Sequence, residues 1–233
     1  MTAAGVERTF DLPGLGTRTY RFPTVFHEVE LLGALGTVPA GAARAWLPQG
    51  LEPAALPGGG VLVMITVQHF PRPAEFPGYR EAALAVYARG GRGGRGFHVL
   101  TMPVTSEENL ARGPTIFGLP KELADVRMAE AGKERVGEVF LGGELLFRLT
   151  VRPWVTLPLR VPVRSRYLQI CGGEPSHVDT RGSARAALAG ASFEHGPLLH
   201  RRFAAFPERF RPFAGVHVTA AELELHLPER AAA

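Results

Sequence analysis

The feature that most constrains the fold is a repeated pattern of short segments with apolar residues, separated by glycine and proline. It is clearest in the middle of the chain, where residues 125–130, 135–141 and 144–151 form three such segments. The breaks between them are residues 131–133 and 142–143, and both contain glycine. Strands joined by tight, glycine-containing turns form an antiparallel meander. The sequence therefore predicts a β-rich structure around this meander.

The rest of the chain repeats the pattern. Further strands are predicted at residues 24–37, 61–67, 79–87, 97–102, 161–170, 186–195 and 216–227. Residues 61–67 are continuously apolar, which is typical of a strand buried on both faces. Short helices are predicted for residues 40–47 and for a segment that starts at Ser106 and ends by Gly113. Residues 197–212 are predicted to be irregular.

No repeat of fixed period and no linker divides these segments. Prolines and glycines break residues 1–23, which we predict to be an irregular N-terminal arm, either an edge strand or an arm onto a neighbouring subunit. Residues 24–233 are predicted to form one domain. The predicted fold class is mostly β (α+β): an antiparallel β-barrel or cone with two or three short helices.

Cysteine content, hydropathy and net charge indicate the cellular compartment and the class of partner. Cys171 is the one cysteine among 233 residues, so no internal disulfide is possible, which fits a reducing cytosol. We find no apolar run long enough to span a membrane and no signal-peptide order at the N-terminus, and we therefore expect a cytoplasmic protein. The isoelectric point is about 9.7, but the net charge is only +4 and the arginines are spread among glutamates. The basicity is weak evidence about partners.

Lysine is rare in this chain. Lys121 and Lys133 are the two lysines, and every other basic residue except the histidines is an arginine. Lys121 follows the apolar residues Ile116, Phe117 and Leu119. Burial disfavours a charged amine, and lysine, unlike arginine, can lose its proton and attack a carbonyl to form a Schiff base. The alternative is a surface lysine just after a turn, with its stem lying on apolar neighbours.

The segment from Ile116 to Ala124 resembles the active-site segment of the acetoacetate decarboxylase superfamily, which reads aromatic, Gly, apolar, Pro, Lys, Lys, Leu. In this resemblance Lys121 falls on the Schiff-base lysine. The triplet Tyr79-Arg80-Glu81 resembles the family's Tyr-x-Glu, whose glutamate is an active-site acid, and this makes Glu81 the second candidate catalytic residue.

The resemblance extends from about residue 24 onward, at low identity, and it implies further contacts. The spacing from Met102 to Lys121 suits the family, which has an apolar strand containing methionine before the lysine segment. The expected substrate-binding residues are Phe117, Leu119, Met102 and His27.

Three departures from the family pattern accompany the resemblance. Glu122 stands where the decarboxylases carry a second lysine, and Gly113-Pro114-Thr115 stands where they have Gly-Arg-Glu. The early strand that carries an active-site arginine in the family offers here His27, Glu28 and Glu30. The residues that would bind a substrate carboxylate in the family are thus altered, while the lysine amine is retained.

The resemblance implies a Schiff-base enzyme that acts on a small keto acid or ketone. It would be a decarboxylase or a related lyase, aldolase or dehydratase, with Lys121 as the nucleophile, Glu81 carrying protons and no metal or organic cofactor. A homo-oligomer is expected. The alternative is a catalytically silent member of the fold that binds a small metabolite.

Other motifs compete with this interpretation. The stretch Arg89–Arg95 resembles an RGG-type nucleic-acid tract, but a hairpin connection between two apolar strands is the preferred interpretation. The eight histidines lack a known metal-ligand spacing. Cys171, His177 and Asp179 could be read as nucleophile, base and orienter, although a cysteine at a strand end is the simpler interpretation. The phenylalanines between residues 193 and 213 are predicted to be core or subunit contacts.

Overall fold

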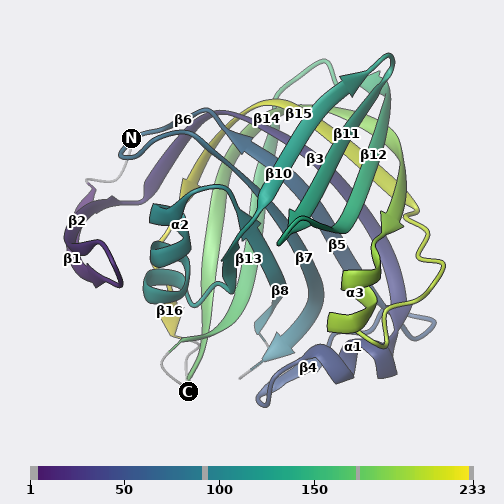
Figure 1. Ribbon diagram of the computed structural model, residues 1–233, viewed down its shortest axis with the longest axis horizontal. Helices are drawn as coiled ribbons and strands as arrows, with labels where there is room; N and C mark the ends of the chain where they lie inside the picture. The colour runs from purple at the N-terminus through teal and green to yellow at the C-terminus, as the bar shows by residue number, and fades with distance from the viewer. Residues whose placement is uncertain (1–4, 91–93, 172–173, 231–233) are drawn as a thin grey trace.

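The structure is a computed structural model that describes residues 5–90, 94–171 and 174–230, and it is mostly β (Figure 1). The described strands are β1 (Val6–Leu12), β2 (Gly16–Phe22), β3 (Thr24–Pro39), β4 (Leu51–Pro53), β5 (Gly60–Phe70), β6 (Arg72–Pro73), β7 (Tyr79–Gly90), β8 (Gly94–Val104), β9 (Lys121–Leu123), β10 (Asp125–Ala131), β11 (Glu134–Leu141), β12 (Glu144–Thr156), β13 (Val161–Cys171), β14 (Glu174–His195), β15 (Ala214–Leu225) and β16 (Glu229–Arg230). The helical segments are α1 (Ala40–Trp46), α2 (Glu107–Arg112), the π-helical turn η1 (Gly113–Phe117) and α3 (Pro197–Arg202).

Seven of the described strands form a cone-like ring. Their order is β3, β5, β7, β8, β13, β14 and β15, and β15 pairs with β3 to complete the circle. Neighbours in the ring are antiparallel except β8 and β13, which meet in a parallel pairing at Phe97 and Tyr167. The predicted mostly β fold, an antiparallel cone with a few short helices, is confirmed. The predicted meander is also confirmed, as β10, β11 and β12.

Strand β14 joins the meander to the ring. It is 22 residues long, and it pairs with β13 over its first half and with β12 over residues 187–195, while β15 runs along its other edge. The prediction began this strand only at residue 186. The earlier residues include Pro175, Asp179 and Gly182, which are of types with little preference for strands, and pairing with β13 and β15 decides their conformation.

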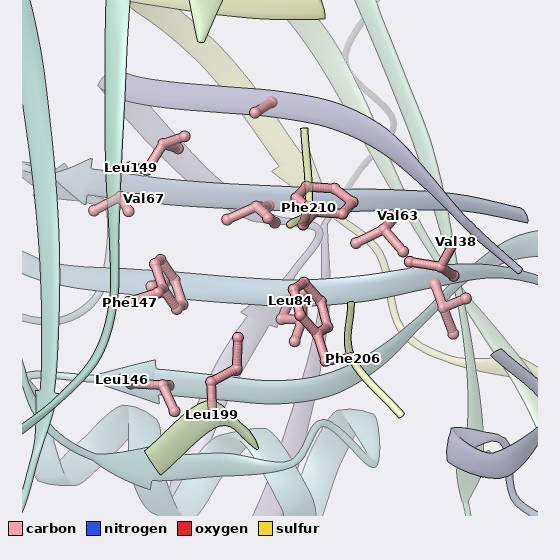
Figure 2. Packing of buried hydrophobic residues seen from close by; sticks show 14 of the residues in the cluster. Val38, Val63, Val67, Leu84, Leu146, Phe147, Leu149, Leu199, Phe206 and Phe210 are labelled. Atoms are coloured by element: carbon pink, nitrogen blue, oxygen red, sulfur yellow. The ribbon is translucent and has the colours of Figure 1, made fainter. Parts of the chain in front are cut away.

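The main core lies between the meander and the outer face of the ring (Figure 2). Val63 and Val67 of β5 and Leu84 of β7 pack there against Phe147 and Leu149 of β12. The meander approaches closely, because a Cβ added at Gly137 of β11 would lie 2.7 Å from the Val67 side chain. The phenylalanines at 206 and 210 close the cluster, which confirms the predicted core role of the aromatic-rich segment; Phe213 instead is exposed.

The N-terminal segment corrects the prediction of an irregular arm. Strands β1 and β2 form a hairpin in which Gly14 lies in the turn and Gly16 begins β2, both with positive φ, so these glycines reverse the chain between two strands. The hairpin folds back onto its own chain. The Tyr20 hydroxyl donates a 2.8 Å hydrogen bond to Glu108 of α2, and Phe22 packs edge-on against Phe117 of η1. The boundary at residue 23 between arm and domain stays a prediction.

The helical segments were predicted in part. Helix α1 is confirmed, and Ser106 caps α2 by accepting a 3.2 Å hydrogen bond from the backbone N–H of Asn109. The helix does not end at Gly113, because a π-helical turn continues it through Phe117 with Pro114 in its first turn, where a missing N–H is tolerated. Helix α3 lies inside the segment predicted to be irregular. No helix in the described parts of the chain has both the length and the hydropathy that a membrane crossing requires.

Candidate active site

The ring encloses a cavity of about 450 Å³, and all seven ring strands contribute lining side chains. Strand β5 shows how the sequence achieves this. Its odd-numbered residues from Val61 to Val67 face the main core, whereas Met64, Thr66 and Gln68 line the cavity. The continuous apolar run thus does form a strand buried on both faces, as predicted.

Lys121 reaches this cavity from β9. The chain leaves η1 through Gly118, whose φ of 65° is left-handed, and then extends, so that Lys121 pairs in parallel with Met102 of β8. The Lys121 side chain is 7% exposed, and its Nζ lies 2.6 Å from Oε2 of Glu81, which is also 7% exposed. The Nζ atom is also 5.6 Å from the centre of the Tyr79 ring. The structure therefore brings both candidate catalytic residues together in one buried site.

The lysine stem lies directly over the π-helical turn. A Cβ added at Gly113 would be 2.4 Å from Cδ of Lys121 and 2.5 Å from its Cγ, so any side chain at this position would push the lysine aside. Single π-helical turns are frequent at functional sites because they shift the direction of the following backbone. Here the turn and its glycine together make room for the amine beside Glu81.

Glu122 faces the opposite side of β9. Its carboxylate accepts hydrogen bonds from Nη1 of Arg202 at 2.7 and 2.9 Å and from the Thr101 hydroxyl. Neighbouring residues of an extended strand point to opposite faces, so this departure from the family pattern does not put a second charge beside the Lys121 amine. The pair with Arg202 ties β9 to the end of α3.

The Lys121–Glu81 pair is neutral as a unit. An ammonium paired with a carboxylate and an amine paired with a carboxylic acid differ only by the position of one proton, so proton transfer within the pair creates no net charge in the cavity. Burial raises the pKa of the Tyr79 phenol well above its ordinary value, with a further contribution from the Glu81 carboxylate. Tyr79 therefore remains protonated at neutral pH.

Of the four expected substrate-binding residues, two line the cavity. Met102 and Leu119 do so together with Lys121 and Glu81. Phe117 is buried behind the wall, where it packs on Phe22, because it ends η1 on the side of the N-terminal hairpin. His27 lies on the molecular surface, with its side chain 49% exposed and paired with Glu222. We therefore leave Phe117 and His27 out of the proposed site.

Thr66 and Gln68 of β5 are among the polar cavity residues that the sequence analysis missed. Both are buried, and Nε2 of Gln68 donates a 3.1 Å hydrogen bond to the Thr66 hydroxyl. Gln68 is the register partner of Glu81 on the neighbouring strand. The signal was present in the sequence as two polar side chains at alternate positions of an otherwise apolar strand, which is the pattern expected when one face meets something other than core.

The competing motifs do not assemble into sites. Asp179 is held by Arg166, and Sγ of Cys171 contacts the carbonyl of Phe117 at 3.3 Å, so these residues form no nucleophile–base arrangement with His177. Among the described residues no three His, Cys, Asp or Glu side chains are grouped to hold a metal ion. Strands β7 and β8 pair up to Gly90 and Gly94, so the Arg89–Arg95 stretch is a hairpin connection, although residues 91–93 lie outside the described part.

Comparisons with known proteins identify the family and the fold. The sequence model of the family described as acetoacetate decarboxylase (ADC) matches residues 13–167, which is more than half of the chain. The chain belongs to the acetoacetate decarboxylase family. Among curated protein sequences, none matches it.

Several solved structures share the fold at low sequence identity. One acetoacetate decarboxylase has a TM-score of 0.71 and 17% identity, covering 91% of this chain and 90% of that one. The enzyme from Legionella pneumophila has a TM-score of 0.67 and 18% identity, with 90% and 87% covered. The enduracididine biosynthesis enzyme MppR, solved with pyruvate, has a TM-score of 0.63 and 16% identity, with 90% of each chain covered.

Proposed function

We propose that this protein is a Schiff-base enzyme in which the amine of Lys121 attacks the carbonyl of a keto acid or ketone. The observation that carries the proposal is the position of that amine, which is 7% exposed, 2.6 Å from a buried carboxylate and inside a cavity of about 450 Å³. A desolvated amine next to a group that can accept its proton is the arrangement that nucleophilic lysine catalysis needs.

The proposed chemistry uses only side chains of the chain. The neutral amine adds to the carbonyl carbon, the carbonyl oxygen takes up protons and leaves as water, and an iminium forms. The iminium draws electrons from the neighbouring C–C or C–H bond, so loss of carbon dioxide or of a proton gives an enamine. Glu81 carries protons to the leaving oxygen and to the enamine carbon, and hydrolysis of the iminium then releases the product and regenerates the amine.

Two observations support a carbonyl substrate. The fold is shared with acetoacetate decarboxylases and with MppR, which has been solved with the keto acid pyruvate. The described lining of the cavity holds Glu81 in contact with the amine, Tyr79, whose ring centre lies 5.6 Å from Nζ, and Gln68, the register partner of Glu81. Their side chains are of types that can donate to or accept from a carbonyl oxygen. We propose no metal or organic cofactor for the reaction, because the iminium itself serves as the electron sink.

Borohydride trapping tests the proposal. The protein is incubated with acetoacetate or butan-2-one, reduced with sodium borohydride, and analysed by intact mass and peptide mapping. We expect one adduct on Lys121, none in Lys121→Ala, and unchanged labelling in Lys133→Ala, which removes the other, exposed lysine as a matched control. Absence of an adduct with every carbonyl compound tried would refute the proposal.

A second candidate function is binding without catalysis, and one observation favours it. A carboxylate 2.6 Å from Nζ also stabilises the ammonium, which cannot attack a carbonyl. A protein of this kind would be stabilised reversibly against heat by keto acids and would give no reduced adduct. The homo-oligomer predicted from the sequence stays a prediction, and sedimentation velocity measures it.

A further inference from the structure

The size of the cavity bears on the substrate, and this inference rests on the function proposed above. At about 30 Å³ for each water-sized group, a volume of about 450 Å³ accommodates on the order of fifteen non-hydrogen atoms. A four-carbon keto acid has only about seven, whereas pockets of roughly 300–1,000 Å³ enclose drug-sized molecules. A small keto acid would therefore leave about half of the space unfilled.

The wall across from the lysine is apolar except for Thr180 of β14. In the order of the ring, β14 lies opposite β7, which carries Glu81. The side chains that line the cavity on this side include Ala184 and Ala186 of β14 and Val216 and Val218 of β15, and Leu31 and Leu35 continue the wall on β3. Apolar surface of this extent binds aliphatic or aromatic groups, since it offers no partner to polar ones.

The cavity also has no cation reserved for a carboxylate next to the amine. Among the described lining residues the cationic side chains are Lys121, which pairs with Glu81, and Arg164, whose residue is exposed and also lines a surface recess on the outside of β13 and β14. A carboxylate held deep in the cavity would therefore meet no arginine in the described lining, because the buried guanidinium of Arg112 lies outside it, over the rings of Tyr20 and Phe76. An uncharged group beside the carbonyl fits the lining better.

We propose that the substrate is a ketone or aldehyde that carries an extended apolar group of about eight or more carbon atoms. Its carbonyl lies at Lys121, and its apolar group lies along the wall formed by β14, β15 and β3. The alanines at 184 and 186, rather than larger residues, keep the space for this group open.

A homologous series of methyl ketones from butan-2-one to decan-2-one tests the proposal. Each ketone is titrated against the wild-type protein in the borohydride experiment, and the concentration that gives half-maximal labelling of Lys121 is measured. We expect this concentration to fall by about three- to fourfold for each added methylene, which is the increment for burying one CH₂ group, and to level off near decan-2-one. Equal labelling by all ketones, or a preference for butan-2-one, would overturn the inference and leave the Schiff-base proposal intact.

Unreactive alcohols separate the two proposals. The alcohols hexan-2-ol and decan-2-ol have the same tails but form no Schiff base, and calorimetry measures their binding to the wild-type protein directly. Tighter binding of decan-2-ol, at a stoichiometry of one, supports the apolar subsite even if no ketone labels Lys121, an outcome that would refute only the catalytic proposal. Failure of decan-2-ol to bind would overturn the subsite.

Filling the apolar wall is the structural test. Ala184→Leu adds bulk where the tail would lie, so labelling by decan-2-one should require at least tenfold higher concentrations while labelling by butan-2-one stays within about twofold. Ala186→Val is a milder variant if Ala184→Leu fails to fold. Leu188→Phe is the matched control, because it enlarges an outward side chain of the same strand that is 44% exposed. An Ala186→Val or Ala184→Leu protein that folds and keeps its chain-length profile would contradict the inference.

Discussion

Strands β5 and β7 are each buried on both faces, and the two faces have different roles. The outer face, with Val63, Val67 and Leu84, meets large side chains of the meander, and the space between them is filled (Figure 2). The inner face, with Gln68 and Glu81, faces across the ring a wall that includes the small side chains of Ala184 and Ala186, and a cavity remains. The same strands thus form a packed core on one side and a cavity on the other, and the residues that face them decide which side is hollow.

The comparison predicts that substitutions on the outer face cost stability and leave the chemistry intact. Phe147→Ala, in the fully buried centre of the main core, should lower the free energy of unfolding by about 3–5 kcal/mol. Urea unfolding measures the loss, and Lys121 labelling should persist wherever the variant is folded. Phe213→Ala is the control and should change stability by less than about 0.5 kcal/mol, because that ring is 63% exposed. A Phe147→Ala protein that folds but is no longer labelled at Lys121 would show that the two faces are not independent.

On the inner face, the buried ion pair should behave as one unit. Lys121→Met leaves the Glu81 carboxylate without its partner and should cost about 3 kcal/mol at neutral pH, whereas Lys121→Met combined with Glu81→Leu should recover most of this loss. Chemical denaturation at pH 7 measures both variants. Equal stability of the single and double variants would mean that the cavity is hydrated well enough to solvate the free carboxylate.

A smaller effect, on the rate of Lys121 labelling, is expected at Gly113, where the backbone of η1 contacts the lysine stem. Gly113→Ala places a methyl group against the lysine stem and should slow labelling by about a hundredfold, the cost of displacing a reacting group by about 1 Å. The matched control is Gly190→Ala, because a Cβ there meets no atom within 4 Å. Identical labelling rates for these two variants would contradict the close fit over the π-helical turn.

The smallest effect is expected on the outer surface of β14. The hydrogen bonds from Arg166 hold the pKa of the Asp179 carboxyl below its ordinary value. This pair therefore contributes stability above about pH 4 and loses it as the pH falls further. Asp179→Asn should cost about 1 kcal/mol at pH 7, flatten the acid limb of a stability–pH curve and leave Lys121 labelling unchanged. A change in Lys121 labelling in Asp179→Asn would show that the outer surface of β14 is coupled to the cavity.

Local pattern was sufficient for much of the fold. The runs that became β5, β7 and the meander, and the short helix before Leu47, were readable because alternation, apolar character and glycine turns act over a few residues. The first half of β14 and the N-terminal hairpin were not, because their weak strand preference is overridden by pairing with distant segments. In the candidate site, Lys121 and Glu81 came from a resemblance in sequence. The alternation of Thr66 and Gln68 in an apolar strand was readable from the sequence, but only the register of β5 against β7 places Gln68 beside Glu81.

By itself the sequence determined a mostly β chain with a single unusual lysine after an apolar segment, since composition and local periodicity are properties of neighbouring residues. Only the tertiary structure decided that this lysine is buried against Glu81, that Glu122 turns away to Arg202, and that His27 lies on the surface. It also decided that the ring is hollow. Whether an apolar face becomes core or cavity depends on the size of the side chains that face it from strands more than a hundred residues away in the sequence, and no local pattern contains that information.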